Sequence, residues 1–155
     1  MRSIAFAAAL VLCMLPYSTA LAETEACTLI LQSQVSAALE IPVDPGTPIG
    51  RPGSCQWMGK GRFATLTITQ PLAGKSPIDR FNAGKASTMP GIVVEPVKGI
   101  GDDAFYVYFN TKERSGLGLV VKKGSSAFEI RVYGLELDKA KSVAKTLCQT
   151  VAGKL

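Results

Sequence analysis

The sequence predicts an α+β fold, in which an antiparallel sheet with a C-terminal β-meander packs against N- and C-terminal helices. Residues 97–134 contain three strand-like segments separated by two polar turns that include glycine, which is the pattern of a meander. Residues 137–151 instead carry apolar side chains at helical spacing, as does a shorter stretch near residue 35. The 155-residue chain has no internal repeat or linker, which fits one α+β domain over residues 23–155.

The meander has the most regular pattern in the chain. Residues 104–109 are aromatic or β-branched apart from the first, as suits a half-buried strand. Residues 117–122 alternate, and residues 128–133 alternate most clearly, with polar or aromatic side chains between apolar ones. Gly124 lies in the turn between these two strands and can take a positive φ without steric cost. We therefore expect one covered and one open side of the sheet.

The elements before the meander are shorter. A helix is predicted over residues 32–40, with Val35 and Leu39 on one side, and Pro42 ends it. Residues 43–54 are rich in proline and glycine and are predicted to form a surface loop. Strands over residues 55–58 and 62–70 follow this loop.

A second short helix is predicted after Ser76, which is a suitable N-cap before Pro77, and should run to about residue 87. The strand predicted over residues 92–97 contains Pro96 and therefore suits a sheet edge. With the final helix the predicted order is α-β-β-α-β-β-β-β-α.

Residues 1–22 have the features of a secretory signal peptide. Arg2 precedes an apolar run, and Ala20 and Ala22 place small residues at −3 and −1 of a cut after residue 22. We expect a periplasmic or secreted protein with no stable membrane anchor after cleavage. A retained anchor is the alternative, although the apolar run is short for a membrane span.

The charge pattern disfavours nucleic acid as a partner. The chain has 17 basic and 12 acidic residues, a formal net charge of +5. Its lysines are scattered, and the adjacent pair Lys122 and Lys123 falls at a predicted turn, where solvated charges are expected.

Histidine is absent from the chain, which excludes Ser-His-Asp and Cys-His catalysis and histidine metal sites. We accordingly assign no catalytic residue, no metal site and no cofactor. Signal cleavage would remove Cys13 and leave Cys27, Cys55 and Cys148. An oxidising compartment would bridge two of these three thiols.

Three short segments resemble a bacterial domain-of-unknown-function family of small secreted proteins and lipoproteins. The family has a C-x-L-L start, similar to the CTLI sequence that begins at Cys27, and a C-x-W strand, similar to Cys55-Gln56-Trp57. Its G-x-G-D-x-A segment is similar to residues 99–104, GIGDDA.

The resemblance implies a Cys27–Cys55 bridge, no established activity, and a sheet-plus-helix sandwich similar to the PsbP-like proteins. The chain departs from the family at Leu31 and Gln34, where the family usually has threonine and glutamate. We therefore expect no capping box at the start of the first helix.

The residues themselves leave the disulfide pairing open. A Cys27–Cys55 bridge would close a loop of about 29 residues and add roughly 3 kcal/mol through loop entropy. Cys148 would then be a free thiol packed as a small apolar side chain. A Cys27–Cys148 bridge would instead join the two ends of the chain.

Neither the glycine motif nor the adjacent carboxylates predict a site. Residues 99–104 match G-x-G-x-x-A but lead into a strand, whereas a dinucleotide-binding loop must open a helix. Asp102 and Asp103 would point to opposite faces of a strand. We expect a turn role, in which Asp102 bonds nearby backbone amides.

The remaining candidate is an aromatic binding patch formed by Tyr106, Tyr108 and Tyr133, with Arg131 nearby. If the polar faces of their strands adjoin, these side chains would suit a ligand or a partner. The alternative is that the tyrosines cover the sheet beneath a helix.

These observations favour an exported, non-enzymatic domain that binds a small ligand or an envelope protein. The alternatives are a secreted inhibitor or effector, and an enzyme that uses carboxylates, lysine or the Cys148 thiol without a recognisable motif. A convergent pocket lined by carboxylates would favour the enzyme, and a flat aromatic patch would favour binding.

Overall fold

Seven strands form one antiparallel sheet in the order β1-β2-β3-β7-β6-β5-β4, and the α+β class is confirmed. The computed structural model describes residues 26–50, 53–109 and 116–155, so the predicted signal peptide lies outside the described residues. The strands are β1 (Thr47–Pro48), β2 (Ser54–Gly59), β3 (Arg62–Ile68), β4 (Ile92–Val97), β5 (Asp103–Phe109), β6 (Leu117–Lys123) and β7 (Ser126–Tyr133).

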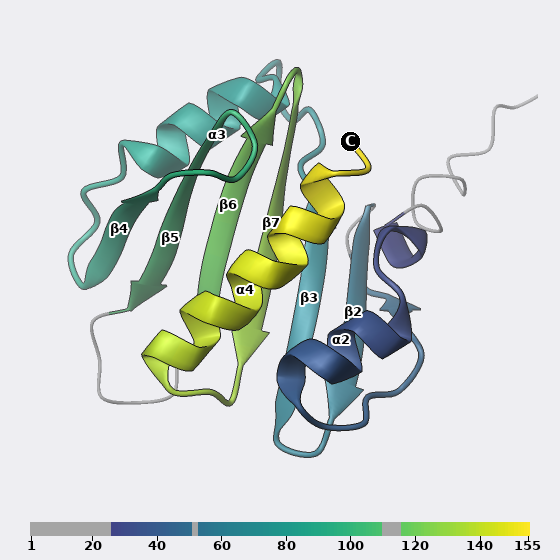
Figure 1. Cartoon of the computed structure of the whole chain (residues 1–155). Helices are drawn as coiled ribbons and strands as arrows, with labels where there is room; N and C mark the ends of the chain where they lie inside the picture. Colours follow the sequence, from purple (N-terminus) through teal and green to yellow (C-terminus); the bar gives the residue numbers. More distant parts are fainter. Residues whose placement is uncertain (1–25, 51–52, 110–115) are drawn as a thin grey trace, which may run out of the picture.

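The helices lie on both sides of this sheet (Figure 1). We call the side that carries α2 (Gln32–Leu39) and α4 (Leu137–Ala152) the front face, and the side that carries α3 (Pro77–Lys85) the back face. Within the described residues, no helix is both long and apolar enough to cross a membrane.

The predicted meander is confirmed, and it extends to β4. Strands β4 to β7 follow one another in the sheet as they do in the chain, and the β2–β3 hairpin joins them through β7. In that junction Thr65 lies opposite Arg131 and Leu66 lies opposite Ile130. Pro96 lies in β4, which is an edge strand of this sheet as its sequence predicts.

The main core lies between the front face and the two helices on it. Leu66, Leu119 and Ile130 of the three central strands are fully buried there. The apolar side of α4 covers them with the side chains of Ala140, Val143, Ala144, Leu147 and Val151. The helical spacing read from residues 137–151 therefore identifies most of the buried side of α4, although Leu137, expected in the same stripe, is 42% exposed.

A smaller core lies on the back face beneath α3, so the expectation of one open side of the sheet is wrong where this helix packs. Phe81 of α3 packs against Phe105 of β5, with ring centroids 5.2 Å apart, and Ala127 of β7 completes the buried cluster. The partly buried residues around this cluster come from β4, β5 and β6. The back-face side chains of β2 and β3 do not belong to this cluster, so they are not part of the core beneath α3.

The helix ends agree only in part with their predictions. Ser76 caps α3 as predicted, because its Oγ accepts from Asp79 N–H at 3.1 Å and Asp79 accepts from Ser76 N–H at 2.9 Å. At α2, Leu31 makes no side-chain cap, but Gln34 Oε1 accepts from Leu31 N–H at 2.9 Å. One half of a capping box is therefore present where we expected none.

The segment predicted as a loop over residues 43–54 contains the short strand β1. Thr47 lies opposite Gln56 and Pro48 lies opposite Cys55, so this segment extends the sheet beyond β2. Two residues give no alternation for sequence analysis to detect, and proline is unfavourable in most strand positions.

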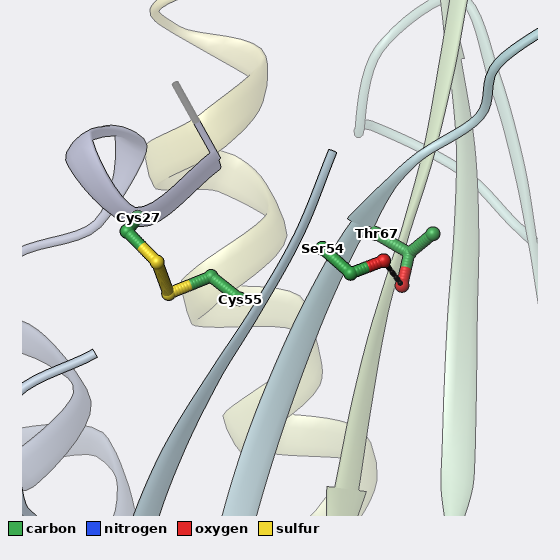
Figure 2. Close-up of a disulfide and its surroundings, with 4 residues drawn as sticks. All are labelled: Cys27, Ser54, Cys55 and Thr67. Atoms are coloured by element: carbon green, nitrogen blue, oxygen red, sulfur yellow. Dashed lines mark hydrogen bonds between the residues drawn. A yellow bond between two sulfur atoms is a disulfide. The ribbon is translucent and has the colours of Figure 1, made fainter. Parts of the chain in front are cut away.

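Cys27 and Cys55 form a disulfide, and Cys148 is a free, buried thiol. The bridge ties the segment before α2 to β2 on the front face. Its neighbour Ser54 points away from the disulfide, and Ser54 Oγ donates to Thr67 Oγ1 at 3.1 Å (Figure 2). The side chains of these two consecutive residues of β2 thus point to opposite faces of the sheet, as in any pleated strand.

Candidate functional site

The four residues of the predicted aromatic patch lie on two faces of the sheet. Tyr106 packs in the front-face core and Tyr108 packs against it, whereas Arg131 and Tyr133 line a groove on the back face. The structure therefore brings together Arg131 and Tyr133 but separates them from the other two tyrosines.

Tyr106 and Tyr108 belong to a front-face cluster with Lys141 of α4 and Glu95 of β4. Lys141 Nζ lies 5.5 Å from the ring centroid of Tyr106 and 5.3 Å from that of Tyr108. It also donates to Glu95 Oε2 at 2.6 Å, to which Tyr108 OH donates at 3.1 Å. Tyr106 OH donates to the backbone carbonyl of Lys141 at 3.1 Å. The cluster joins α4 to β4 and β5.

The electrostatics of this cluster suit a structural role. The hydrogen bond from Lys141 lowers the pKa of Glu95, and the same bond raises the pKa of Lys141. Burial raises the pKa of Tyr106 and of Tyr108. Each shift stabilises the ordinary charge state of its group at neutral pH. A general acid or base would require shifts in the opposite direction.

The stronger candidate is the groove on the back face, which has a volume of about 510 Å³. We call it the back-face groove. Its lining comes from β2, β3, β7 and the segment beside β1, and consists of Ile49, Gly50, Ser54, Gln56, Phe63, Thr65, Thr67, Glu129, Arg131 and Tyr133. The strands that form it are held in register by the β2–β3 hairpin and by the β3–β7 pairing.

Strand register arranges the side chains of the back-face groove in rows across the strands. Gln56, Thr65 and Arg131 lie side by side on β2, β3 and β7 and form the middle row. Neighbouring strands are about 4.8 Å apart, so this row spans roughly 10 Å. It presents an amide, a hydroxyl and a guanidinium to the same space. These groups provide several donors and acceptors for a polar ligand.

Arg131 forms an ion pair with Glu129 at the floor of the back-face groove. Its Nε and Nη2 both donate to Glu129 Oε1, at 2.9 and 2.5 Å. The Arg131 side chain is 34% exposed and that of Glu129 is 26% exposed. Burial is the largest single influence on the pKa of Arg131 and acts to lower it, but the charge and hydrogen bonding of Glu129, together with Tyr133, raise the pKa overall. The guanidinium is therefore a permanent cation in this groove.

Gly118 of β6 and Gly116, which directly precedes this strand, provide the space for these side chains. A Cβ at Gly118 would lie within 3.0 Å of Glu129 Oε1, and a Cβ at Gly116 would lie within 3.0 Å of the Tyr133 ring. Both glycines are buried. The side chains of Glu129 and Tyr133 can therefore occupy this space only because residues 116 and 118 have no side chain.

An aromatic pair closes one end of the back-face groove. The rings of Phe63 and Tyr133 lie opposite each other on β3 and β7, with centroids 4.1 Å apart and planes within 13° of parallel. We call this pair the aromatic wall.

A second depression, of about 640 Å³, lies beside α2 but is a weaker candidate. Its polar side chains already have partners within the protein. Gln32 donates to the carbonyl of Val43, Ser36 Oγ accepts from Val43 N–H, and Glu40 pairs with Lys139. These contacts hold the chain after α2 in place and leave little capacity for a ligand.

The residues considered for catalysis are dispersed. Asp102 accepts from Gly124 N–H at 2.7 Å, which confirms its turn role, whereas Asp103 pairs with Lys85 at 2.6 Å. The thiol of Cys148 is fully buried, and burial raises its pKa well above the usual range. No cluster of metal-binding side chains occurs among residues 26–50, 53–109 and 116–155.

Most residues of the back-face groove were not predicted from the sequence. Arg131 and Tyr133 were predicted, but their neighbours Gln56 and Thr65 were not, because the β3–β7 pairing joins residues that are 60 to 70 apart in the sequence. A usable signal was present in Gly118, which lies inside β6. Glycine inside a strand often marks a close approach of another group.

Comparisons with protein-family models, with curated proteins and with solved structures found no match to this chain. The resemblance to a family of small secreted proteins, and with it the similarity to PsbP-like proteins, therefore stays a prediction.

Proposed function

We propose that this protein is an exported, non-enzymatic binding domain of the cell envelope and that it binds a small polar ligand in the back-face groove. The observation that carries the proposal is that Gln56, Thr65 and Arg131 lie side by side on three paired strands and all line the same groove. Elsewhere on the back face, α3 packs on apolar side chains of the sheet.

The size of the back-face groove favours a small ligand over a protein partner. Small-molecule sites commonly have volumes of about 300–1,000 Å³ with a few well-placed polar groups, and the groove lies in that range. A protein interface would instead require a broad surface of about 800 Å² on each partner. The exposed apolar side chains of the described residues are scattered over loops, strand ends and helix ends.

The shifts in pKa support binding rather than catalysis. The carboxylates with resolved shifts all have a lowered pKa, through hydrogen bonds to lysine for Glu40, Glu95 and Asp103 and to Ser76 for Asp79. None of them is therefore tuned to exchange protons near neutral pH. The absence of histidine supports the same conclusion.

Export to the periplasm is supported by the signal-like residues 1–22 and by the Cys27–Cys55 disulfide. Disulfides persist in oxidising compartments and are rare in the cytosol. A domain held together by such a bridge suits the envelope.

The proposal is tested with purified mature protein and the low-molecular-mass fraction of a periplasmic extract. Native mass spectrometry detects a retained compound, and thermal unfolding detects stabilisation by it. The groove variant is Thr65→Trp, which places a large ring in the middle row. The matched control is Thr88→Trp, at an exposed position outside the groove.

We expect the wild-type protein and Thr88→Trp to retain the same compound and to be stabilised by it, and Thr65→Trp to lose both effects. Each variant is first shown to unfold cooperatively, so that loss of binding is not loss of folding. Binding that survives Thr65→Trp would place the site elsewhere. If no compound stabilises the wild-type protein, the proposal is wrong.

A further inference from the structure

We infer that the ligand of the back-face groove is a small zwitterion that carries an ammonium and a carboxylate group, as a free amino acid or a short peptide does. This inference rests on the proposed function and names the class of ligand for the same site. It is argued from the Arg131–Glu129 pair and the residues beside it.

The charges that line the groove favour a ligand with both signs of charge. Among the described lining residues, Arg131 is the cation and Glu129 is the anion, and they are in direct contact. A ligand with one charge would be attracted by one partner and repelled by the other at almost the same distance. A zwitterion can place each of its charges beside the opposite one, so both contacts are favourable.

The ion pair leaves capacity for such a ligand without being broken. Both hydrogen bonds of the pair converge on Oε1 of Glu129. A guanidinium has five N–H donors and a carboxylate has two oxygens. Two donors of Arg131 serve this pair and one more interacts with Tyr133, so at least one N–H of Nη1 is left, and Oε2 of Glu129 is not used in the pair. A ligand carboxylate can accept from Nη1 while a ligand ammonium donates to Oε2.

The neighbouring residues complete the fit. Gln56 and Thr65 extend the row from Arg131 and can bond the remaining polar atoms of the ligand. The aromatic wall of Phe63 and Tyr133 lies at one end of the groove, where the apolar part of an amino acid would pack.

The test measures binding by isothermal titration calorimetry with the standard amino acids and a set of dipeptides. Each ligand that binds is then compared with its N-acetyl form, which lacks the ammonium, and its amide form, which lacks the carboxylate. We expect each change to weaken binding by about tenfold or more, because a hydrogen bond between charged groups is lost.

Two variants assign each ligand group to its partner. In Glu129→Gln the unmodified ligand should bind more weakly than it binds the wild-type protein. N-acetylation of the ligand should then weaken binding to the variant by less than about threefold, because the side chain proposed to contact the ammonium is already neutral. In Arg131→Gln the unmodified ligand should also bind more weakly, and conversion of the ligand to its amide should weaken binding to this variant by less than about threefold. Asp103→Asn, which disrupts an ion pair on the same face outside the groove, is the control and should change affinity less than about twofold.

The outcomes separate this inference from the proposed function. If the extract compound binds and is lost in Thr65→Trp but no zwitterion binds, the site stands and the ligand class is wrong. If N-acetyl or amide forms bind as tightly as the free forms, the ligand class is also wrong. If neither the extract nor any zwitterion yields binding, both proposals fail.

Discussion

The carboxylate of Glu129 in β7 lies over Gly118 in β6, in the space that a side chain at residue 118 would occupy. From this position it accepts both hydrogen bonds from Arg131. The backbone of β6 thus sets the geometry of an ion pair formed entirely by β7, and the floor of the back-face groove depends on a residue with no side chain.

Gly118→Ala should therefore displace Glu129 and lower the free energy of unfolding by about 1–3 kcal/mol, as overpacking does. Val107 also lies within 3.0 Å of the new Cβ and must shift. Urea unfolding measures the loss. Gly153→Ala, where the nearest atom to a Cβ is 3.5 Å away, is the control and should have a much smaller effect. In a Glu129→Ala background the cost of Gly118→Ala should fall, and an unchanged cost would contradict this account.

Loss of the Cys27–Cys55 disulfide should lower the free energy of unfolding by about 3 kcal/mol, because the bridge joins residues 28 apart in the sequence. The comparison is between oxidised protein and the Cys27→Ser, Cys55→Ser double variant, by guanidinium unfolding. Reductant should destabilise the wild-type protein and leave the double variant unchanged. Equal sensitivity of both proteins to reductant would rule out this bridge as the source of the stability.

Stability in acid should depend on Glu95. Because the hydrogen bond from Lys141 lowers the pKa of Glu95 in the folded protein, its contribution is present above the unfolded pKa and is lost as pH falls through the folded pKa. The urea midpoint of Glu95→Gln should therefore change less than that of the wild type below about pH 5. The effect should be modest, since the Glu95 side chain is 43% exposed and is screened by solvent. Asp44→Asn is the control, and identical acid profiles for Glu95→Gln and the wild type would contradict the prediction.

Ser76→Ala should lower the free energy of unfolding by about 1 kcal/mol, because Ser76 caps α3 and shares two further hydrogen bonds with Asp79. Thermal and urea unfolding give the change, and Ser125→Ala, in the exposed turn before β7, is the control. Ser76→Thr should retain most of the cap. An alanine variant as stable as the wild type would contradict a stabilising role for this cap.

Expression of the full chain in a Gram-negative bacterium should deliver a periplasmic protein that begins at Glu23. Intact mass and N-terminal peptide mapping of the periplasmic fraction provide the measurement. A mass that includes residues 1–22, recovered in the membrane fraction, would favour a retained anchor instead.

Local patterns in the sequence predict much of this fold. Strand β7 has polar residues on one side and apolar residues on the other, and the structure places Ile130 in the core and Arg131 in the groove accordingly. The cap at Ser76 and the edge position of Pro96 also follow from local chemistry. These features depend on neighbours in the sequence.

The predicted tyrosine patch depended on information that local patterns do not contain. Strand β5 is covered on both faces, with Tyr106 beneath α4 and Phe105 beneath α3, so both sets of alternating residues are apolar or aromatic. Alternation therefore could not show which face the tyrosines share. The back-face groove could not be predicted for a second reason. The pairing of Thr65 with Arg131 depends on the order of the strands in the sheet, which local sequence patterns do not determine.

The burial of Cys148 bears on how the oxidised protein is made. While the chain is unfolded, three thiols compete for two positions, and Cys148 can capture Cys27 in a non-native bridge. Once α4 docks on β6, the Cys148 thiol is fully buried beside the backbone carbonyl of Leu119 and is out of reach of an oxidant. Correct disulfide pairing then depends on the order of folding and oxidation. If the C-terminal helix packs before the first disulfide forms, Cys55 is the available partner of Cys27.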